Sequence, residues 1–519
     1  MQQLDKNYIL TEALNFHHQG KLEEADHLYC KVLDVDKNNF QANHLHGCIL
    51  SQKSKYSEAI SFLEKAARLS PLNYEANNNL ALAYKNVKNI SQSEKYYLNA
   101  IKIDKNNYKA YFNCANLYID EKRYDEALEF LKESLLYNSN LVSIPHRIGE
   151  VYQYIFQNNR DTKLLESSRE YFQDAIKCDK NHANSYIMLG ITHLWLSNIN
   201  EANKFFNKAS SLNNYNNIFI NNYIKKYLSD SNLLITLIKH EFEQLTYIDN
   251  DTDDIRNTKF TKKYYDDLKQ LYLDIKYKRF NADKISLTFK RKLFKQLYNK
   301  PPKIIPNNLL NKANKVSVLE NEYLNSNPEI LVIDNLLNLE SLNILQKFCN
   351  NANIFKYPYQ GGYVSTFLTK GLSNEFILKF SEDLRETYKN IFKEFRLTQA
   401  WVFKHENKKE GTNIHADQAS VNVNFWISPN DANLNKNSGG LILWDKLPPA
   451  DWSFKDYNSI NGSKKIEKML IDNNISKKVI PYKENRAVIF NSKLFHSTDF
   501  FDFKDTYENR RINITFLYD

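Results

Sequence analysis

Small and apolar residues recur with a fixed period along the first 217 residues. Similar segments begin at Asp36, Ser70 and Asp104, so that successive segments lie 34 residues apart. Between them, small residues and aromatic or aliphatic ones alternate at helical spacing, which is typical of closely packed helix pairs. The next spacing, from Asn138 to Asp179, is 41 residues and predicts about 7 extra residues in the fifth repeat. We count six helical repeats over residues 7–217.

A period of 34 residues is that of tetratricopeptide repeats, whose helix pairs stack into a solenoid. We therefore predict an all-α tetratricopeptide solenoid with a concave surface suited to a protein or peptide partner. Exposed positions on the first helix of each repeat would carry that function. The candidates are Asn77, Asn78, Tyr111, Asn113 and Arg147.

Residues 218–328 form a predicted helical connector with a basic surplus. Residues 256–303 hold fifteen Lys or Arg against four Asp. Such a surplus can attract nucleic acid or an acidic peptide, but the interpretation we favour is a solvated face. An acidic stretch at 249–254 lacks the Gly and Glu of a calcium loop, so we interpret it as a solvated loop. Prolines at 301, 302, 306 and 328 predict the boundary to the next domain.

The last part of the chain, residues 329–519, has the two-residue alternation of β-strands. Residues 330–333 read as a buried strand, and the segments 399–404, 421–427 and 511–517 alternate. In the last segment Arg511, Asn513 and Thr515 share one face. Helices are predicted at 339–350 and 374–395, and an insertion at 445–476.

His415, Asp417 and His496 are the candidate metal ligands. In an extended segment, side chains two residues apart leave the same face, so His415 and Asp417 point into one space. Two imidazoles and one carboxylate on one face of an octahedral ion leave three positions free, as in non-haem Fe(II) oxygenases. His496 is the best third ligand because it lies in a predicted strand, residues 495–498, after the buried segment 486–490. Taken singly, each residue could instead be a hydrogen-bonded or surface side chain.

Arg511 is the candidate anchor for an anion, because a planar guanidinium suits a carboxylate bidentately. Arg510 is the alternative candidate for this role. We prefer Arg511 because its face of the strand continues polar through Asn513. Asn422 and Asn424 face one way from the segment 421–427, and one of them, with Asn424 as our candidate, could hydrogen-bond a cosubstrate or substrate.

These residues, with the segment 438–444 between them, resemble the 2-oxoglutarate and Fe(II)-dependent dioxygenases, and most closely the prolyl-4-hydroxylase-like branch. The resemblance covers residues 329–519 and implies a double-stranded β-helix (jelly-roll) barrel with supporting helices. It implies that His415, Asp417 and His496 bind Fe(II) and that Arg511 holds the distal carboxylate of 2-oxoglutarate. O₂ would be consumed as 2-oxoglutarate is converted to succinate and the substrate is hydroxylated.

The sequence departs from the prolyl hydroxylase pattern at two places. It has Arg511 where many of those enzymes have Lys, and Asn513 where related Arg-type enzymes often have Ser. These departures leave the substrate open rather than pointing to proline.

We therefore expect a multidomain α + β protein with three domains, at 1–217, 218–328 and 329–519. The favoured function is a dioxygenase that hydroxylates a protein or peptide side chain recruited by the repeats. One alternative is an oxygenase for a small molecule, a glycan or a nucleobase, with the repeats as scaffold. The other is a non-catalytic protein-interaction protein.

The beginning of the chain lacks a basic region followed by an apolar core, and no run approaches the roughly 20 apolar residues of a membrane span. The five cysteines are scattered and show no CxxC spacing, which fits reduced thiols. We expect a cytoplasmic location and no membrane partner.

Overall fold

The computed structural model describes residues 3–215, 217–250, 262–297, 299–409 and 411–519. The chain divides into two compact units, residues 1–180 and residues 181–519. Within the described ranges, no helix has both the length and the apolar content needed to cross a bilayer. The predicted acidic loop at 249–254 lies mostly outside the described residues.

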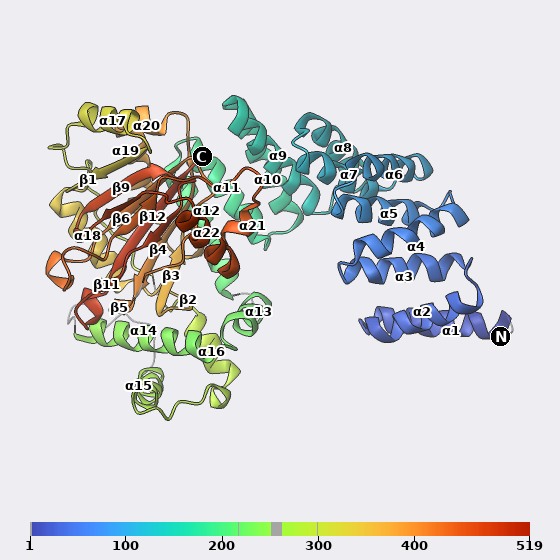
Figure 1. The fold of residues 1–519 in the computed structure, drawn as a ribbon, viewed down its shortest axis with the longest axis horizontal. Helices are drawn as coiled ribbons and strands as arrows, with labels where there is room; N and C mark the ends of the chain where they lie inside the picture. The colour runs from blue at the N-terminus through green and yellow to red at the C-terminus, as the bar shows by residue number, and fades with distance from the viewer. Residues whose placement is uncertain (1–2, 216, 251–261, 298, 410) are drawn as a thin grey trace. The chain divides into compact units, whose positions relative to one another are not determined.

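Unit 1 consists of helices that pack in consecutive pairs and follow one another in chain order (Figure 1). The helices are α1 (Gln3–His18), α2 (Leu22–Val35), α3 (Phe40–Gln52), α4 (Tyr56–Leu69), α5 (Tyr74–Asn86), α6 (Ile90–Ile103), α7 (Tyr108–Asp120), α8 (Tyr124–Tyr137), α9 (Ser143–Asn159) and α10 (Lys163–Cys178).

Two features of the sequence explain this regular packing. The side chains of Asn39, Asn73 and Asn107 each accept a hydrogen bond from a backbone N–H and cap α3, α5 and α7 at the repeat period. The small residues let the two helices of a pair approach closely. A Cβ added at Gly47 would lie 2.7 Å from Leu63 Cγ.

The extra residues of the fifth repeat lengthen its helices. α9 has 17 residues and α10 has 16, compared with 13 and 14 in the preceding pair.

The prediction that Asn77 and Asn78 are exposed is wrong, since they are only 4% and 9% exposed. The Asn77 amide donates to the backbone oxygens of Pro71 and Asn73, and so stabilises the turn before α5. The Asn78 side-chain oxygen accepts from Asn113 Nδ2 of the next repeat at 3.0 Å. Both residues therefore hold the solenoid together.

Unit 2 combines helices with antiparallel sheets (Figure 1). Its helices are α11 (Ala183–Trp195), α12 (Ile199–Tyr215), α13 (Asn217–Tyr227), α14 (Ser231–Asn250), α15 (Lys262–Lys276), α16 (Leu287–Phe294), α17 (Val316–Asn325), α18 (Leu339–Asn351), α19 (Glu375–Thr387), α20 (Lys389–Phe392), α21 (Phe454–Tyr457) and α22 (Ile460–Asp472). Its strands are β1 (Ile330–Ile333), β2 (Tyr357–Tyr359), β3 (Tyr363–Phe367), β4 (Leu397–His405), β5 (Lys408–Lys409), β6 (Val421–Trp426), β7 (Leu441–Trp444), β8 (Lys477–Ile480), β9 (Arg486–Asn491), β10 (His496–Thr498), β11 (Phe501–Asp502) and β12 (Ile512–Tyr518).

The strands form a seven-stranded sheet in the order β1-β9-β6-β12-β4-β3-β2, a three-stranded sheet β10-β7-β8 and a two-stranded sheet β11-β5. All the strand pairs are antiparallel. In the large sheet, Thr515 of β12 lies opposite Asn424 of β6. Polar side chains of the two central strands therefore share one face.

The structure divides at residue 180, whereas the sequence analysis set boundaries at 217 and 328. The last predicted repeat and the connector belong to unit 2 because their apolar faces join its main core. Trp195 Nε1 of α11 donates to Leu397 O of β4 at 2.8 Å, and Gln244 Nε2 of α14 donates to Ala352 O at 3.0 Å. α14 lies between the sheet and α15 (Figure 1).

The predicted helix at 374–395 is divided at Tyr388 into α19 and the short α20. The insertion at 445–476 contains α21 and α22, whose apolar side chains pack around Ala416 and Phe495.

Candidate metal centre

Two neighbouring backbone segments bring the predicted ligands together. His415 N donates to His496 O at 3.0 Å, and His496 N donates to His415 O at 2.8 Å. Asp417 N donates to Ser492 O at 3.0 Å. This antiparallel pairing places the two imidazole rings with their centroids 4.4 Å apart.

The donor atoms of His415, Asp417 and His496 lie within 4.8 Å of one another. Asp417 Oδ2 is 3.5 Å from His496 Nε2. Each imidazole bonds through Nδ1 to the carbonyl oxygen two residues earlier, at 2.9 Å to Asn413 and 2.8 Å to Leu494. Because a carbonyl oxygen only accepts, Nδ1 carries the proton in both rings and Nε2 is left with a lone pair for a metal ion.

The electrostatics of the site also suit a cation. Burial lowers the pKa of His415, and the neighbouring His496 lowers it further, so the imidazole is kept neutral. Burial alone would raise the pKa of Asp417. Contacts with His496, His415 and Asn422 outweigh burial and lower the pKa of Asp417 below its ordinary value. The site therefore presents two imidazoles, each with Nδ1 bonded to a backbone carbonyl, and an ionised carboxylate, which are the residue types of a facial metal centre.

These ligands line an open cavity with a volume of about 580 Å³. One wall is aromatic: the rings of Tyr359 and Tyr363 stack with centroids 4.8 Å apart, and both meet Phe403 edge-on. Neutral polar side chains, including Asn422, Asn424, Asn513 and Thr515, form another part of the lining. Among the described residues that line this cavity there is no Lys or Arg.

Arg511 lies immediately beside the cavity and is 1% exposed. Its Nε donates to Gly439 O at 2.7 Å and its Nη2 to Gly440 O at 3.3 Å, next to the cavity-lining Leu441. Its Nη1 is buried without a hydrogen-bond partner among the residues that the structure describes. Burial lowers the pKa of Arg511 to about 10, so the guanidinium is charged at neutral pH.

The two glycines make this arrangement possible. Gly439 has φ +83°, and a Cβ added at Gly440 would lie 1.9 Å from Ile480 O. The backbone therefore approaches closely enough for two consecutive carbonyl oxygens to hold the guanidinium.

The other predicted residues lie in different surroundings. Arg510 is paired with the carboxylate of Glu243 of α14 at 2.5 Å, whereas Arg511 has no carboxylate partner among the described residues, which separates the two. Asn424 lines the cavity and its Oδ1 accepts from Trp426 Nε1 at 2.8 Å. Asn513 also lines it, and its Nδ2 donates to Thr515 Oγ1 at 3.1 Å.

The sequence analysis did not single out Asn422, which donates from Nδ2 to Asp417 Oδ2 at 2.9 Å. Alternation along the strand placed Asn422 and Asn424 on one face, but the contact depends on the bend between Asp417 and β6. No sequence signal shows that bend.

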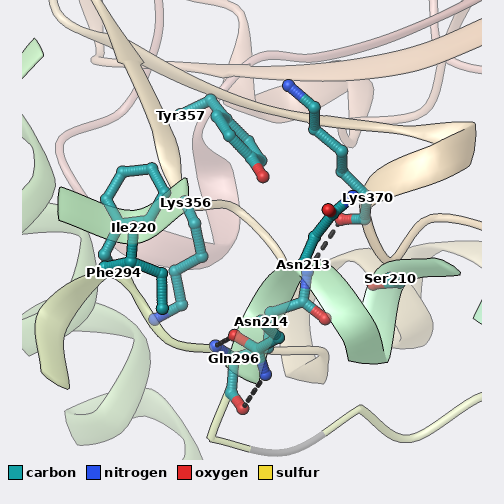
Figure 2. Close-up of a pocket in the computed structure, with 9 residues that line it drawn as sticks. All are labelled: Ser210, Asn213, Asn214, Ile220, Phe294, Gln296, Lys356, Tyr357 and Lys370. Atoms are coloured by element: carbon teal, nitrogen blue, oxygen red, sulfur yellow. Dashed lines mark hydrogen bonds between the residues drawn. The ribbon is translucent and has the colours of Figure 1, made fainter. Parts of the chain in front are cut away.

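A smaller cavity of unit 2, with a volume of about 20 Å³, is lined by none of the candidate residues. Figure 2 shows its lining, in which Asn214 and Gln296 exchange hydrogen bonds of 3.3 and 3.0 Å. The side chains of Lys356 and Lys370 extend in opposite directions (Figure 2). Lys356 Nζ donates to Glu241 Oε2 at 2.6 Å. These lysines therefore do not converge on a common ligand.

Comparisons with known proteins concern the repeats. The tetratricopeptide repeat family model matches residues 40–71, 74–107 and 108–141. A human protein, O-mannosyl-transferase TMTC3, is 26% identical over 222 residues, which are 40% of this chain and 24% of that protein. The chain thus spans about a quarter of the length of this curated relative.

The solved structures that match the chain do so with low TM-scores. YrrB, described as a tetratricopeptide-repeat protein with an unusual peptide-binding site, has a TM-score of 0.30 and 16% identity, and covers 36% of this chain and 93% of its own. PilF of Pseudomonas aeruginosa has a TM-score of 0.35 and 15% identity, and covers 42% of this chain and 97% of its own. The match of the family model, together with the paired helices, shows that the chain carries tetratricopeptide repeats within unit 1.

Proposed function

We propose that unit 2 is a 2-oxoglutarate- and Fe(II)-dependent oxygenase whose strands form a double-stranded β-helix (jelly-roll) barrel. The proposal is supported by the origin of the cavity lining. Asn424 comes from β6 of the large sheet, whereas Leu441 and His496 come from β7 and β10 of the three-stranded sheet. A cavity enclosed between two antiparallel sheets is the place where such a barrel holds a ligand.

His415, Asp417 and His496 would hold the iron, which when bound with 2-oxoglutarate supplies the oxidation of a C–H bond by O₂. The protein's own part is geometric. Backbone carbonyls of Asn413 and Leu494 orient the imidazoles. All three candidate ligands line the cavity, so an ion that they held would be reached from it.

Arg511 would anchor the distal carboxylate of 2-oxoglutarate through its unpartnered Nη1. Its other two nitrogens, Nε and Nη2, donate to the carbonyl oxygens of Gly439 and Gly440, so the guanidinium has little conformational freedom to lose on binding. A buried charged nitrogen without a hydrogen-bond partner favours binding of an anion. Asn513, two residues further along the chain, could present its amide to the same carboxylate.

A polypeptide segment is the substrate that we favour. Tetratricopeptide repeats are protein-interaction modules, so unit 1 supplies a means of recruitment. The described cavity lining is aromatic and amide-bearing and lacks Lys and Arg, which suits an uncharged side chain better than a phosphate-bearing nucleotide.

The observation that carries the proposal is the convergence of two Nε2 atoms and one carboxylate in a cavity beside a buried, partly unpartnered arginine. The test is anaerobic addition of Fe(II) and 2-oxoglutarate to the full chain. The expected result is a weak visible absorption band of the chelate, followed by succinate release when O₂ is admitted. If neither band nor succinate appears under reducing conditions, the oxygenase proposal is overturned and the repeats become the functional part.

A further inference from the structure

Asn422 touches the candidate metal centre directly. It is the second residue of β6, is 0% exposed and lines the cavity. Its Nδ2 donates to Asp417 Oδ2 at 2.9 Å. The other two amides on this wall bond elsewhere, Asn424 with Trp426 and Asn513 with Thr515.

The contact with Asp417 fixes which way the Asn422 amide points. If the amide were reversed, its oxygen would face a carboxylate oxygen and two acceptors would repel one another. Asn513 is not fixed in this way, since the Thr515 hydroxyl can either donate or accept. In the fixed orientation, Asn422 Oδ1 is buried without a hydrogen-bond partner among the described residues.

This arrangement costs stability, because a buried acceptor without a hydrogen-bond partner is unfavourable. An apolar side chain of similar size at position 422 would avoid the cost. Packing alone therefore does not explain an asparagine here, and its contact with the carboxylate offers a reason.

The contact restrains Asp417. The backbone N–H of Asp417 is bound to Ser492 O at 3.0 Å, which leaves rotation of the carboxylate as its main freedom. Asn422 opposes that rotation while Oδ2 stays 3.5 Å from His496 Nε2. A ligand that is already oriented loses less freedom when a metal binds.

We propose that Asn422 is a positioning residue that holds the Asp417 carboxylate ready for the metal ion, an inference that rests on the proposed metal centre. Loss of such an outer partner typically lowers metal affinity by about 10- to 100-fold.

The experiment is titration of the full chain with Mn(II), with the free ion measured by electron paramagnetic resonance. Asn422→Leu keeps the volume and removes the donor. Asn422→Ser is a second variant that fits the same space but is too short to reach the carboxylate. The matched control is Thr515→Val, which changes a buried polar side chain of the same cavity lining whose hydrogen bond is to Asn513 and not to a candidate ligand.

The expected result is affinity about 10- to 100-fold weaker in both Asn422 variants, and within about 3-fold of wild type in Thr515→Val. Thermal unfolding without metal shows whether each variant remains folded, since Asn422→Leu loses the bond to Asp417 and also removes the unpartnered oxygen. Tight Mn(II) binding by the wild type with equal affinity in both Asn422 variants overturns the inference alone. Failure of the wild type to bind overturns the metal centre and the inference together.

Discussion

Two groups of three side chains, one in each unit, contain the residue types that bind metal ions, and their geometries differ. In unit 1 the group is Asp26, Cys30 and His46, and in unit 2 it is His415, Asp417 and His496. In unit 1, Asp26 Oδ1 lies 2.6 Å from His46 Nδ1, a hydrogen-bond distance. Two ligands of one ion with bonds of about 2.1 Å are held about 3 Å or more apart, so this pair is too close to share an ion.

The neighbouring residues also favour a hydrogen-bonded cluster in unit 1 and a metal centre in unit 2. Lys53 Nζ lies 2.9 Å from Asp26 Oδ2 and neutralises its charge, and Cys30 Sγ approaches the same nitrogen of His46 at 3.8 Å. Burial raises the pKa of Cys30, and Asp26 raises it further, so the thiol keeps its proton. In unit 2 the Nδ1 atoms are bound by the backbone and both Nε2 atoms point into a shared space. Residue types alone thus do not distinguish a hydrogen-bonded cluster from a metal centre, whereas the distances between the candidate ligand atoms do.

The largest expected effect is on metal binding. His415→Ala should reduce Mn(II) or Fe(II) affinity by about 100-fold or more, since one of three protein ligands is lost. His46→Ala should leave the affinity and the stoichiometry unchanged. Equilibrium dialysis followed by elemental analysis measures both, and equal losses in the two variants would remove the distinction between the clusters.

The next effect concerns 2-oxoglutarate. Arg511→Met should weaken its binding by about 2 kcal/mol or more, which is about 30-fold, with metal affinity unchanged. Arg510→Met is the matched control, because the neighbouring Arg510 is buried like Arg511 but is already paired with Glu243. Calorimetry of the Mn(II)-loaded protein under anaerobic conditions measures this. The anchor assignment fails if the two variants lose the same affinity.

A smaller effect is expected in unit 1. Asp26→Asn removes the carboxylate that binds His46 and Lys53 and should lower the free energy of local unfolding by about 1–2 kcal/mol. Glu23→Gln is the control, because the Glu23 side chain is 84% exposed and its ion pair contributes about 0.5 kcal/mol or less. Hydrogen exchange of the amides in α2 and α3 measures both. Unchanged protection in Asp26→Asn would show that the cluster has no structural role.

The smallest effect concerns the cysteines. Cys178 is exposed and should be alkylated first, Cys30 more slowly, and the buried Cys114 and Cys349 last. Burial raises the pKa of Cys114 and of Cys349 to about 12. Added Zn(II) should not protect Cys30 from iodoacetamide if its cluster is held by hydrogen bonds. Mass spectrometry of the labelled peptides tests this, and protection by Zn(II) would indicate a metal site in unit 1.

The parts of the fold that depend on local periodicity could be predicted from the sequence. The 34-residue period placed the helix pairs, and the asparagine caps at 39, 73 and 107 follow the same period. The division of the chain could not be predicted, because it depends on contacts between distant residues. Trp195 and Leu397, which are hydrogen-bonded in unit 2, are 202 positions apart.

In the candidate site too, the contacts between distant residues could not be predicted from the sequence. Strand alternation identified the wall that carries Asn424 and Asn513, and the spacing of His415 and Asp417 indicated a shared direction. The sequence could not show that Asn422, rather than Asn424, contacts Asp417, since this contact depends on how the chain bends after Asp417. Nor could it show that Gly439 and Gly440 would hold Arg511, because those segments are about 70 residues apart.

The most direct test of the central claim is anomalous X-ray diffraction from crystals of the full chain grown anaerobically with Mn(II). The account predicts one strong anomalous peak, coordinated by His415, Asp417 and His496, and none at Asp26, Cys30 and His46. A peak at the unit 1 cluster, or no peak between the two histidines and Asp417 at saturating Mn(II), would contradict it.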